Sequence, residues 1–457
     1  MIGVEQDLNE AQQTAVDHAG GPLLIVAGAG TGKTRVLVER YRRLRQEGVA
    51  ADRILLLTFT DKAAREVLDR VEREDYLRAG ERYVLTYHAF AQRFLQEEGW
   101  LCGIARGYRM VSEVRKWEIM RDVLFALRPR RLFHAQRPYE RIGDLLKLIE
   151  RAKQELISPA EFTRWAATVT GTDDPALEAQ VEAAGVYAAY QERLLAENRL
   201  DFDDTIFYSA QLLSDEPSVA RRQGARFEQV MVDEFQDTNY AQSRLLELLS
   251  ASHRNLCVVG DDDQSIYKFR GASVANLRRF QAMFPQAPMI RLEDNYRSRG
   301  PILRAAERLI KDDEDRLSKR LRSTRGEGPA VSILTAPGVA EEADAVAAYV
   351  KRAIGEGRHR PSEIAILLRA NAHLHNFARA LQRAGVAYQV SGGRGFYQQP
   401  EIKDCLAFLR AIDSPDDSIC LMRLLTLPRY RIDPVQAARF AREAKDTGRR
   451  LFDLLEG

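Results

Sequence analysis

Apolar residues occur along this chain in short continuous runs separated by longer amphipathic stretches. A strand that is buried on both faces of a parallel sheet is typically a run of about four to eight apolar residues. The segments that fit this pattern are residues 23–26, 54–59, 83–87, 227–232 and 256–260, although the second, third and fourth include one or two polar residues. Together with the helical segments between them, they predict an α/β fold built on a parallel sheet.

The stretch over residues 101–199 has a different pattern. It consists of long helical segments and has no evident buried strand. Lys33, which follows the first apolar run, and Asp233, which follows the fourth, are 200 positions apart, far more than one α/β core needs. We interpret residues 101–199 as an all-helical domain inserted into an α/β domain that comprises residues 1–100 and 200–285.

Composition changes this picture little. The chain has 457 residues, too many for one compact core, and this length predicts about three domains. A hydrophobic content of 45% and a charged content of 29% are ordinary for a soluble globular protein. The net charge of +2 is too small to indicate a nucleic-acid partner by itself. The four cysteines have no metal-ligand spacing, and no apolar run reaches the ~18 residues of a membrane span, so we expect a cytoplasmic protein without a membrane partner.

The first apolar run ends in a glycine-rich turn that leads directly into a helix. In such a turn, successive backbone N–H groups and the helix N-terminus bind phosphate oxygens. Lys33 would reach the β- and γ-phosphates of ATP, and the Thr34 hydroxyl would hold Mg²⁺. The alternative, a tight βα turn that binds no phosphate, does not explain this Lys-Thr pair. The motif departs from the usual pattern at its first position, where alanine replaces glycine. The residues that we expect to bind ATP here are Ala27, Gly28, Ala29, Gly30, Thr31, Gly32, Lys33, Thr34 and Arg35.

Acidic and amide side chains are placed to complete an ATP site. Asp233 and Glu234 follow the fourth run, and Gln264 lies shortly after the fifth. Ligands of an open parallel sheet bind at the carboxyl ends of its strands, so these residues are expected beside the phosphates. Asp233 would hold Mg²⁺, directly or through water, and Glu234 would orient or deprotonate the attacking water, with a surface acidic pair as the alternative. Gln264 would sense the γ-phosphate. The amide of Gln12 can read an adenine edge, or it can belong to a solvated helix residue.

Aromatic residues near strand ends are candidates for stacking on nucleic-acid bases. Phe59 ends the second run, and Tyr87 and His88 lie at the end of the third, with core packing as the alternative explanation. Tyr267 and Phe269 lie two residues apart and would share one face of an extended segment.

These motifs form an ordered series that resembles the UvrD/Rep/PcrA family of superfamily 1 DNA helicases, and the resemblance covers nearly the whole chain. Each motif alone is modest evidence, but eight of them in the family's order are specific. The segments that carry the resemblance are Leu8-Asn9 with Gln12, and residues 27–34, 58–64, 86–88, 200–204, 232–239, 260–272 and 295–298.

The resemblance implies two RecA-like P-loop domains with ATP between them, each carrying a helical insertion. It also implies movement along single-stranded DNA from 3′ to 5′ and action at junctions of single-stranded and duplex DNA. By resemblance, Gln12 reads adenine, Tyr296 stacks on it, and Arg297 reaches the γ-phosphate across the cleft. The implied catalytic residues are Lys33, Glu234, Gln264 and Arg297. The residues implied to contact DNA are Phe59, Thr60, His88, Tyr267, Phe269 and Arg270.

The resemblance also divides the second half of the chain. The second RecA-like domain is expected over residues 286–412, and a second helical insertion would begin within residues 413–457. The expected strands of the second domain lie near residues 289–292, 330–334, 363–368 and 388–390.

We find no counterpart of the family's last two motifs, which include an arginine finger. Such an arginine can be worth about 10³ to 10⁵ in rate, so we expect this chain to be an N-terminal portion that binds ATP and DNA but hydrolyses ATP poorly. A C-terminal half or a partner protein would then supply the missing motifs.

Two other functions share the phosphate-binding motif. A nucleotide-gated DNA-binding or scaffold subunit would keep the motif and the acids without turnover of its own. A small-molecule kinase does not explain the segments 267–270 and 295–298. We therefore favour an ATP-dependent DNA helicase or translocase of repair, replication or recombination.

Overall fold

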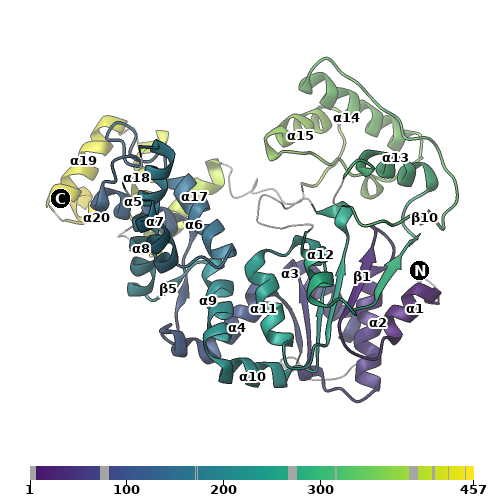
Figure 1. The fold of residues 1–457 in the computed structure, drawn as a ribbon. Coiled ribbons are helices and arrows are strands. Elements are labelled where there is room, and N and C mark those ends of the chain that lie inside the picture. Colours follow the sequence, from purple (N-terminus) through teal and green to yellow (C-terminus); the bar gives the residue numbers. More distant parts are fainter. Residues whose placement is uncertain are drawn as a thin grey trace. The chain divides into compact units, whose positions relative to one another are not determined.

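The computed structural model describes most of the chain as two compact units, residues Met1–Val331 and Ser332–Gly457 (Figure 1). The described residues are 7–72, 82–169, 171, 173–265, 275–313, 316–390, 400–413, 417–430, 432–447 and 449–456. Within them, no helix combines the length and the apolar character that crossing a membrane requires.

A six-stranded sheet of parallel strands forms the centre of the first unit. In spatial order, the strands are β3 (Tyr83–Thr86), β2 (Ile54–Thr58), β6 (Gln229–Val232), β7 (Leu256–Gly260), β1 (Leu23–Ala27) and β8 (Met289–Leu292). The residues of β1, β2, β6 and β7 are all buried, as expected for strands that are covered on both faces. The predicted α/β fold with a parallel sheet is therefore confirmed.

Helices cover both faces of this sheet, and alternate residues of each strand point to opposite layers. On one face, Ile25 packs in a core with α1, α2 and α3. On the other face, Leu24 packs in a core with α4, α9, α11 and α12. The bounds of these helices are Glu10–Asp17 (α1), Lys33–Gln46 (α2), Asp61–Glu72 (α3), Tyr87–Glu98 (α4), Phe202–Asp215 (α9), Tyr240–Ser250 (α11) and Ala275–Met283 (α12). The helix α10 (Pro217–Arg226) leads from α9 into β6.

The helices between α4 and α9 build a core of their own. They are α5 (Glu113–Leu127), α6 (Ile142–Gln154), α7 (Pro159–Thr168) and α8 (Pro175–Ala196). Two short parallel strands, β4 (Arg109–Met110) and β5 (Arg199–Leu200), lie where the chain enters and leaves this group.

A buried ion-pair network joins these helices to α9. The Nζ atom of Lys153, on α6, lies 2.6 Å from a carboxylate oxygen of Asp201 and 2.7 Å from one of Asp204. Asp201 also caps α9, because its carboxylate accepts the backbone N–H of Asp204 at 2.9 Å. One lysine therefore fixes the inserted helices to the first turn of α9.

The segment after residue 286 differs from the expected start of a second domain. Met289–Leu292 forms β8, which pairs with β1 in the first sheet, with Ile290 opposite Ile25. This strand covers the backbone edge that β1 would otherwise expose. The chain continues through β9 (Asp294–Asn295), α13 (Gly300–Ile310) and β10 (Arg322–Ser323), and β9 and β10 also pair in parallel.

The second unit is helical in its described part. Its helices are α14 (Val339–Gly355), α15 (Leu374–Arg383), α17 (Pro400–Asp413), α18 (Ser418–Leu425), α19 (Pro434–Thr447) and α20 (Leu451–Glu456). The segments 330–334, 363–368 and 388–390, expected as strands, have no strand in the described structure. Ile364, Ile366 and Leu368 nevertheless pack against α14 and α15, while Leu367 is 93% exposed. This segment therefore has the alternation of packed and exposed side chains that is typical of a strand, but it is not assigned as a strand in the described structure.

We predict that Lys153→Met lowers the free energy of unfolding by about 3 to 5 kcal/mol, because two buried carboxylates lose their cation. Urea unfolding followed by circular dichroism measures this change. Arg304→Met is the control, since it breaks an exposed pair with Glu327 and should change the unfolding midpoint much less. Equal unfolding midpoints for the two variants would contradict the prediction.

Candidate functional site

A cavity of about 450 Å³ lies where β1, β6 and β7 end. It is lined by the turn after β1, by residues that follow β6, β7 and β9, and by α1 and α3. The lining residues are Gln12, Ala29, Gly30, Gly32, Lys33, Thr34, Arg35, Glu66, Arg70, Glu234, Gln264, Tyr296 and Arg297. The structure thus brings together every residue proposed for catalysis, and most of those proposed to bind ATP.

The turn after β1 requires glycine at two positions. Gly30 and Gly32 have φ angles of 75° and 91°, in the left-handed region that favours glycine. A Cβ atom on Gly32 would lie 2.7 Å from Nε2 of Gln12, and one on Gly30 would lie 2.5 Å from Cβ of Arg297. Helix α2 then begins at Lys33, so its free backbone N–H groups face the turn.

An ion pair links the lysine of this turn to the acid after β6. The Nζ atom of Lys33 lies 2.9 Å from Oε2 of Glu234, and Gln236 donates a 2.7 Å hydrogen bond to the same oxygen. The Lys33 side chain is only 10% exposed, so its charge has little access to water. A bound phosphate would therefore compete with Glu234 for Lys33.

Asp233 precedes this glutamate and is buried at the end of β6. Burial and the charge of Glu234 raise the pKa of its carboxyl to about 6, although the charge of Lys33 opposes the shift. Asp237 behaves similarly, because burial and Glu234 raise its pKa to about 7. A carboxylate and the hydroxyl of Thr34 are oxygen donors of the kind that Mg²⁺ prefers, so the residues present fit that ion.

The opposite side of the cavity is built around Gln12. Its Nε2 atom donates to the backbone oxygen of Thr31 at 2.9 Å, and its Oε1 atom accepts the backbone N–H of Asn9 at 3.1 Å. The Nδ2 atom of Asn9 donates to the hydroxyl of Tyr296 at 3.0 Å. The Gln12 amide keeps a second hydrogen and a second lone pair for a base edge.

Arg297 reaches the cavity because its segment is attached to the glycine-rich turn. The side-chain amide of Asn295 donates to the backbone oxygen of Ala29, and the Tyr296 N–H donates to that of Gly30 at 2.9 Å. The backbone N–H of Arg297 in turn donates to Oδ1 of Asn295 at 3.0 Å. Arg297 was expected to act from a second domain across a cleft, but here it belongs to the same compact unit as Lys33.

The described residues that we proposed to contact DNA do not line this cavity. Phe59 is half-buried, and Thr60 is exposed and accepts the N–H of Ala63 in the first turn of α3 at 3.1 Å. The His88 ring lies 4.4 Å, between centroids, from that of the exposed Phe202. Tyr87, in contrast, is buried in the core, so core packing explains this residue. Tyr267, Phe269 and Arg270 lie outside the described residues.

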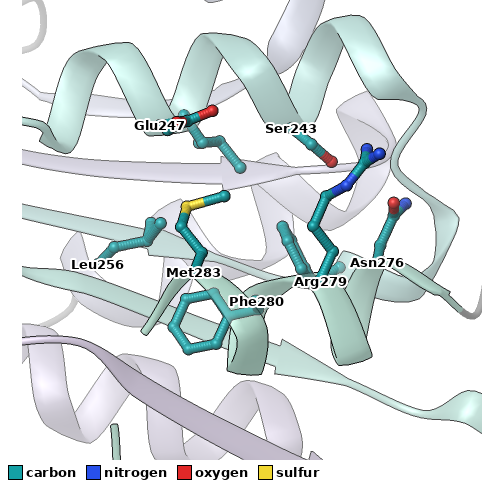
Figure 2. A pocket seen from close by; sticks show the side chains of 9 residues that line it. Ser243, Glu247, Leu256, Asn276, Arg279, Phe280 and Met283 are labelled. Carbon is teal, nitrogen blue, oxygen red and sulfur yellow. The ribbon is translucent and has the colours of Figure 1, made fainter. Parts of the chain in front are cut away.

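A much smaller cavity, of about 10 Å³, lies between α11 and α12 (Figure 2). Its lining combines apolar residues such as Phe280, Met283 and Leu256 with the side chains of Ser243, Glu247, Asn276 and Arg279. Its size is that of a packing void, so we assign no ligand to it.

Glu66 and Arg70 also line the larger cavity and were not predicted from the sequence. They lie one turn apart on α3 and form a 2.6 Å ion pair. Their i, i+4 spacing on the helix that follows β2 is the signal that could have indicated them.

Comparison with known proteins identifies related chains. Residues 8–285 match the model of the UvrD/REP helicase N-terminal domain, and residues 290–457 match that of the UvrD-like helicase C-terminal domain. The ATP-dependent DNA helicase PcrA of Bacillus subtilis is 37% identical over 452 residues, which are 98% of this chain and 59% of that protein. PcrA of Leuconostoc citreum is 36% identical over 94% of this chain and 56% of its own length. A probable DNA helicase II homolog of Rickettsia felis is 34% identical over 93% and 63%, respectively.

The chain spans about three-fifths of the length of these relatives. The second match corrects the expectation that this chain is only an N-terminal portion. Residues from 290 onward match the family's C-terminal domain. This match gives no support to the expected partner protein that would supply missing motifs.

His88, which is half-buried, provides a test of the packing around the residues proposed to contact DNA. Burial lowers the pKa of His88 to about 4, against the charge of Asp61, whereas an unfolded chain has a histidine pKa of about 6.5. Between these values only the unfolded chain binds the proton, so stability falls as pH falls, by up to about 1.4 kcal/mol per pH unit. We expect His88→Gln to reduce the stability loss between about pH 7 and about pH 5, measured by urea unfolding.

The exposed His134 provides the control for this measurement. His134→Gln removes an exposed imidazole and shows the effect of the substitution itself. A pH dependence in His88→Gln equal to that of the parent protein would show that His88 is accessible to protons in the folded state.

Proposed function

Because the chain belongs to the UvrD/REP helicase family, we propose that it acts as an ATP-dependent DNA helicase that moves along single-stranded DNA. The observation that carries this proposal is the Lys33–Glu234 ion pair in a cavity that also holds Gln264 and Arg297. A cavity of about 450 Å³ is within the usual range for small-molecule sites, about 300 to 1,000 Å³.

The geometry favours the following arrangement of ATP. The phosphates would contact the turn after β1, and Lys33 would exchange Glu234 for phosphate oxygens. Glu234, freed from the lysine, would accept a proton from the attacking water, while Gln264 and Arg297 would contact the γ-phosphate. Gln12 would bind the adenine edge, and Tyr296 would stack on the base.

Asp233 and Thr34 would hold Mg²⁺. The ion would neutralise charge on the β- and γ-phosphates. Asp233 and Thr34 would thereby hold the end of β6 and the start of α2 close to those phosphates.

Single-stranded DNA would bind at the aromatic residues beyond the cavity. Phe59, Thr60 and His88 are the described candidates, and the sequence adds Tyr267, Phe269 and Arg270. A neutral imidazole ring stacks on a base without binding a particular phosphate, which suits sequence-independent movement. Movement from 3′ to 5′ and action at junctions with duplex DNA complete the proposal, by analogy with the family.

We predict that the purified chain hydrolyses ATP faster when single-stranded DNA is present. Lys33→Ala should weaken nucleotide binding, because the phosphates lose their cation. Glu234→Gln should bind nucleotide but lose turnover by about 10²- to 10⁴-fold, the usual contribution of a general base. Steady-state phosphate release and the binding of a fluorescent ATP analogue separate these two effects.

Glu228→Gln is the matched control. Glu228 precedes β6 at its opposite end and forms an exposed ion pair with Arg53, so its removal should leave turnover unchanged. Nucleotide and DNA binding without turnover in the parent chain would instead support the nucleotide-gated DNA-binding subunit. Turnover in Glu234→Gln equal to that of the parent would refute the assignment of the base.

A further inference from the structure

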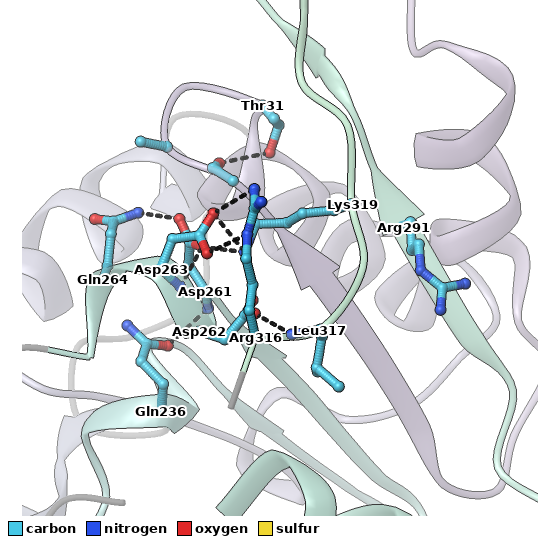
Figure 3. A network of polar contacts seen from close by, with 12 residues as sticks. Thr31, Gln236, Asp261, Asp262, Asp263, Gln264, Arg291, Arg316, Leu317 and Lys319 are labelled. Atoms are coloured by element: carbon cyan, nitrogen blue, oxygen red, sulfur yellow. Dashed lines mark hydrogen bonds and ion pairs between the residues drawn. The ribbon is translucent and has the colours of Figure 1, made fainter. Parts of the chain in front are cut away.

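Lys319 is buried among three consecutive aspartates (Figure 3). Its Nζ atom lies 2.7 Å from Asp261 and 3.1 Å from Asp263, and it also contacts Asp262. The three aspartates form the turn that follows β7, whereas Lys319 comes from the segment between α13 and β10. Neither the family motifs nor the nucleotide cavity accounts for this lysine.

The cluster depends on cations from that one segment. Arg316 adds a bidentate contact to Asp263, at 2.9 and 3.2 Å, and the backbone N–H of Leu317 donates to Asp262. Burial favours the neutral amine of Lys319, but the aspartates outweigh it and raise its pKa above the usual value. Three adjacent carboxylates are a familiar arrangement for a metal ion. Here the ammonium group occupies the position among the oxygens that a metal would need.

The same turn is connected to the nucleotide cavity by hydrogen bonds. The side chain of Gln264, which lines the cavity, donates to the carboxylate of Asp261. The backbone N–H of Asp261 donates to Oε1 of Gln236 at 2.9 Å, and Gln236 donates to Glu234 at 2.7 Å. Lys319 is therefore linked through Asp261 to both the proposed γ-phosphate sensor and the proposed base.

The Lys319 segment also touches the glycine-rich turn. A Cβ atom on Gly28 would lie 2.5 Å from Cδ2 of Leu321, so the leucine packs directly on that glycine. Two residues further on, Ser323 pairs with Asn295, which holds the segment of Arg297. Residues 316–323 thus contact three of the elements that surround the cavity.

We propose that Lys319 is a positioning residue that holds Asp261, and through it Gln264, so that the site distinguishes ATP from ADP. The inference rests on the proposed function, because it requires that ATP binds in this cavity. Lys319 would not touch the nucleotide. It would act by fixing the turn after β7 against the glycine-rich turn, so that the Gln264 amide meets the γ-phosphate.

We predict that Lys319→Met reduces the preference for a non-hydrolysable ATP analogue over ADP by about tenfold, a typical coupling between sites. The affinity for ADP should stay close to that of the parent, because the glycine-rich turn and Lys33 are unchanged. Calorimetric titration with each nucleotide measures the ratio. Gln264→Ala should lower the ratio similarly, and the double variant should lower it no further than Gln264→Ala alone.

Lys153→Met is the matched control, since Lys153 is also fully buried and bound by two aspartates, but away from the cavity. It should lose stability and keep the ATP preference, which separates positioning from general destabilisation. A folded Lys319→Met with the parent's ATP preference would overturn the inference, and so would additive losses in the double variant.

If Lys319→Met does not fold, Lys319→Arg decides the question. Arginine keeps the positive charge but is longer, so it should fold and displace Asp261, with loss of the ATP preference. Parental preference in Lys319→Arg would then overturn the inference. A parent chain that binds neither nucleotide would instead refute the proposed function, and these two failures are therefore distinguishable.

Discussion

The parallel register of four neighbouring strands is the constraint on which the site depends. Val26 of β1 lies opposite Gly260 of β7, and Val232 of β6 lies opposite Val258 of β7 and Leu57 of β2. Because these strands run in the same direction, the segments that follow them emerge at one edge of the sheet. A slip of one residue would exchange the two faces of a strand and expose apolar side chains, so core packing also fixes the site.

Within this frame, the site is organised as pairs of opposite charges with little access to water. Burying a charge is costly unless it is paired, which explains why Lys33 contacts Glu234 and why Lys319 contacts three aspartates. The two groups are joined through Gln236 and Asp261. A ligand that takes Lys33 from Glu234 therefore changes the charge balance of the whole network. Through this network, a phosphate bound at Lys33 would affect the turn after β7.

The sequence predicted the parts of the fold and site whose signals are local. The glycine-rich turn and the acids after β6 follow apolar runs directly, and both lie where those runs indicate. Lys319 was not predicted, because its surroundings are basic and polar, like a solvated surface, and its partner Asp262 is 57 positions away. Tyr87 illustrates a boundary effect: β3 ends at Thr86, which caps α4, and the helix turns the ring of Tyr87 into the core. The apolar runs of the second unit were read as strands, but a strand also needs a neighbour, which a single run cannot reveal.

The backbone of Glu234 has a strained conformation. Its φ angle of 52° lies in the left-handed region, where a residue other than glycine costs of order 1 to 3 kcal/mol. Glycine would relieve this strain but would remove the carboxylate that contacts Lys33. Residues on both sides hold the conformation, since Asp233 is buried at the end of β6 and Gln236 binds the Glu234 side chain. This strained conformation directs the carboxylate toward Lys33 of the glycine-rich turn, as the proposed role of Glu234 requires.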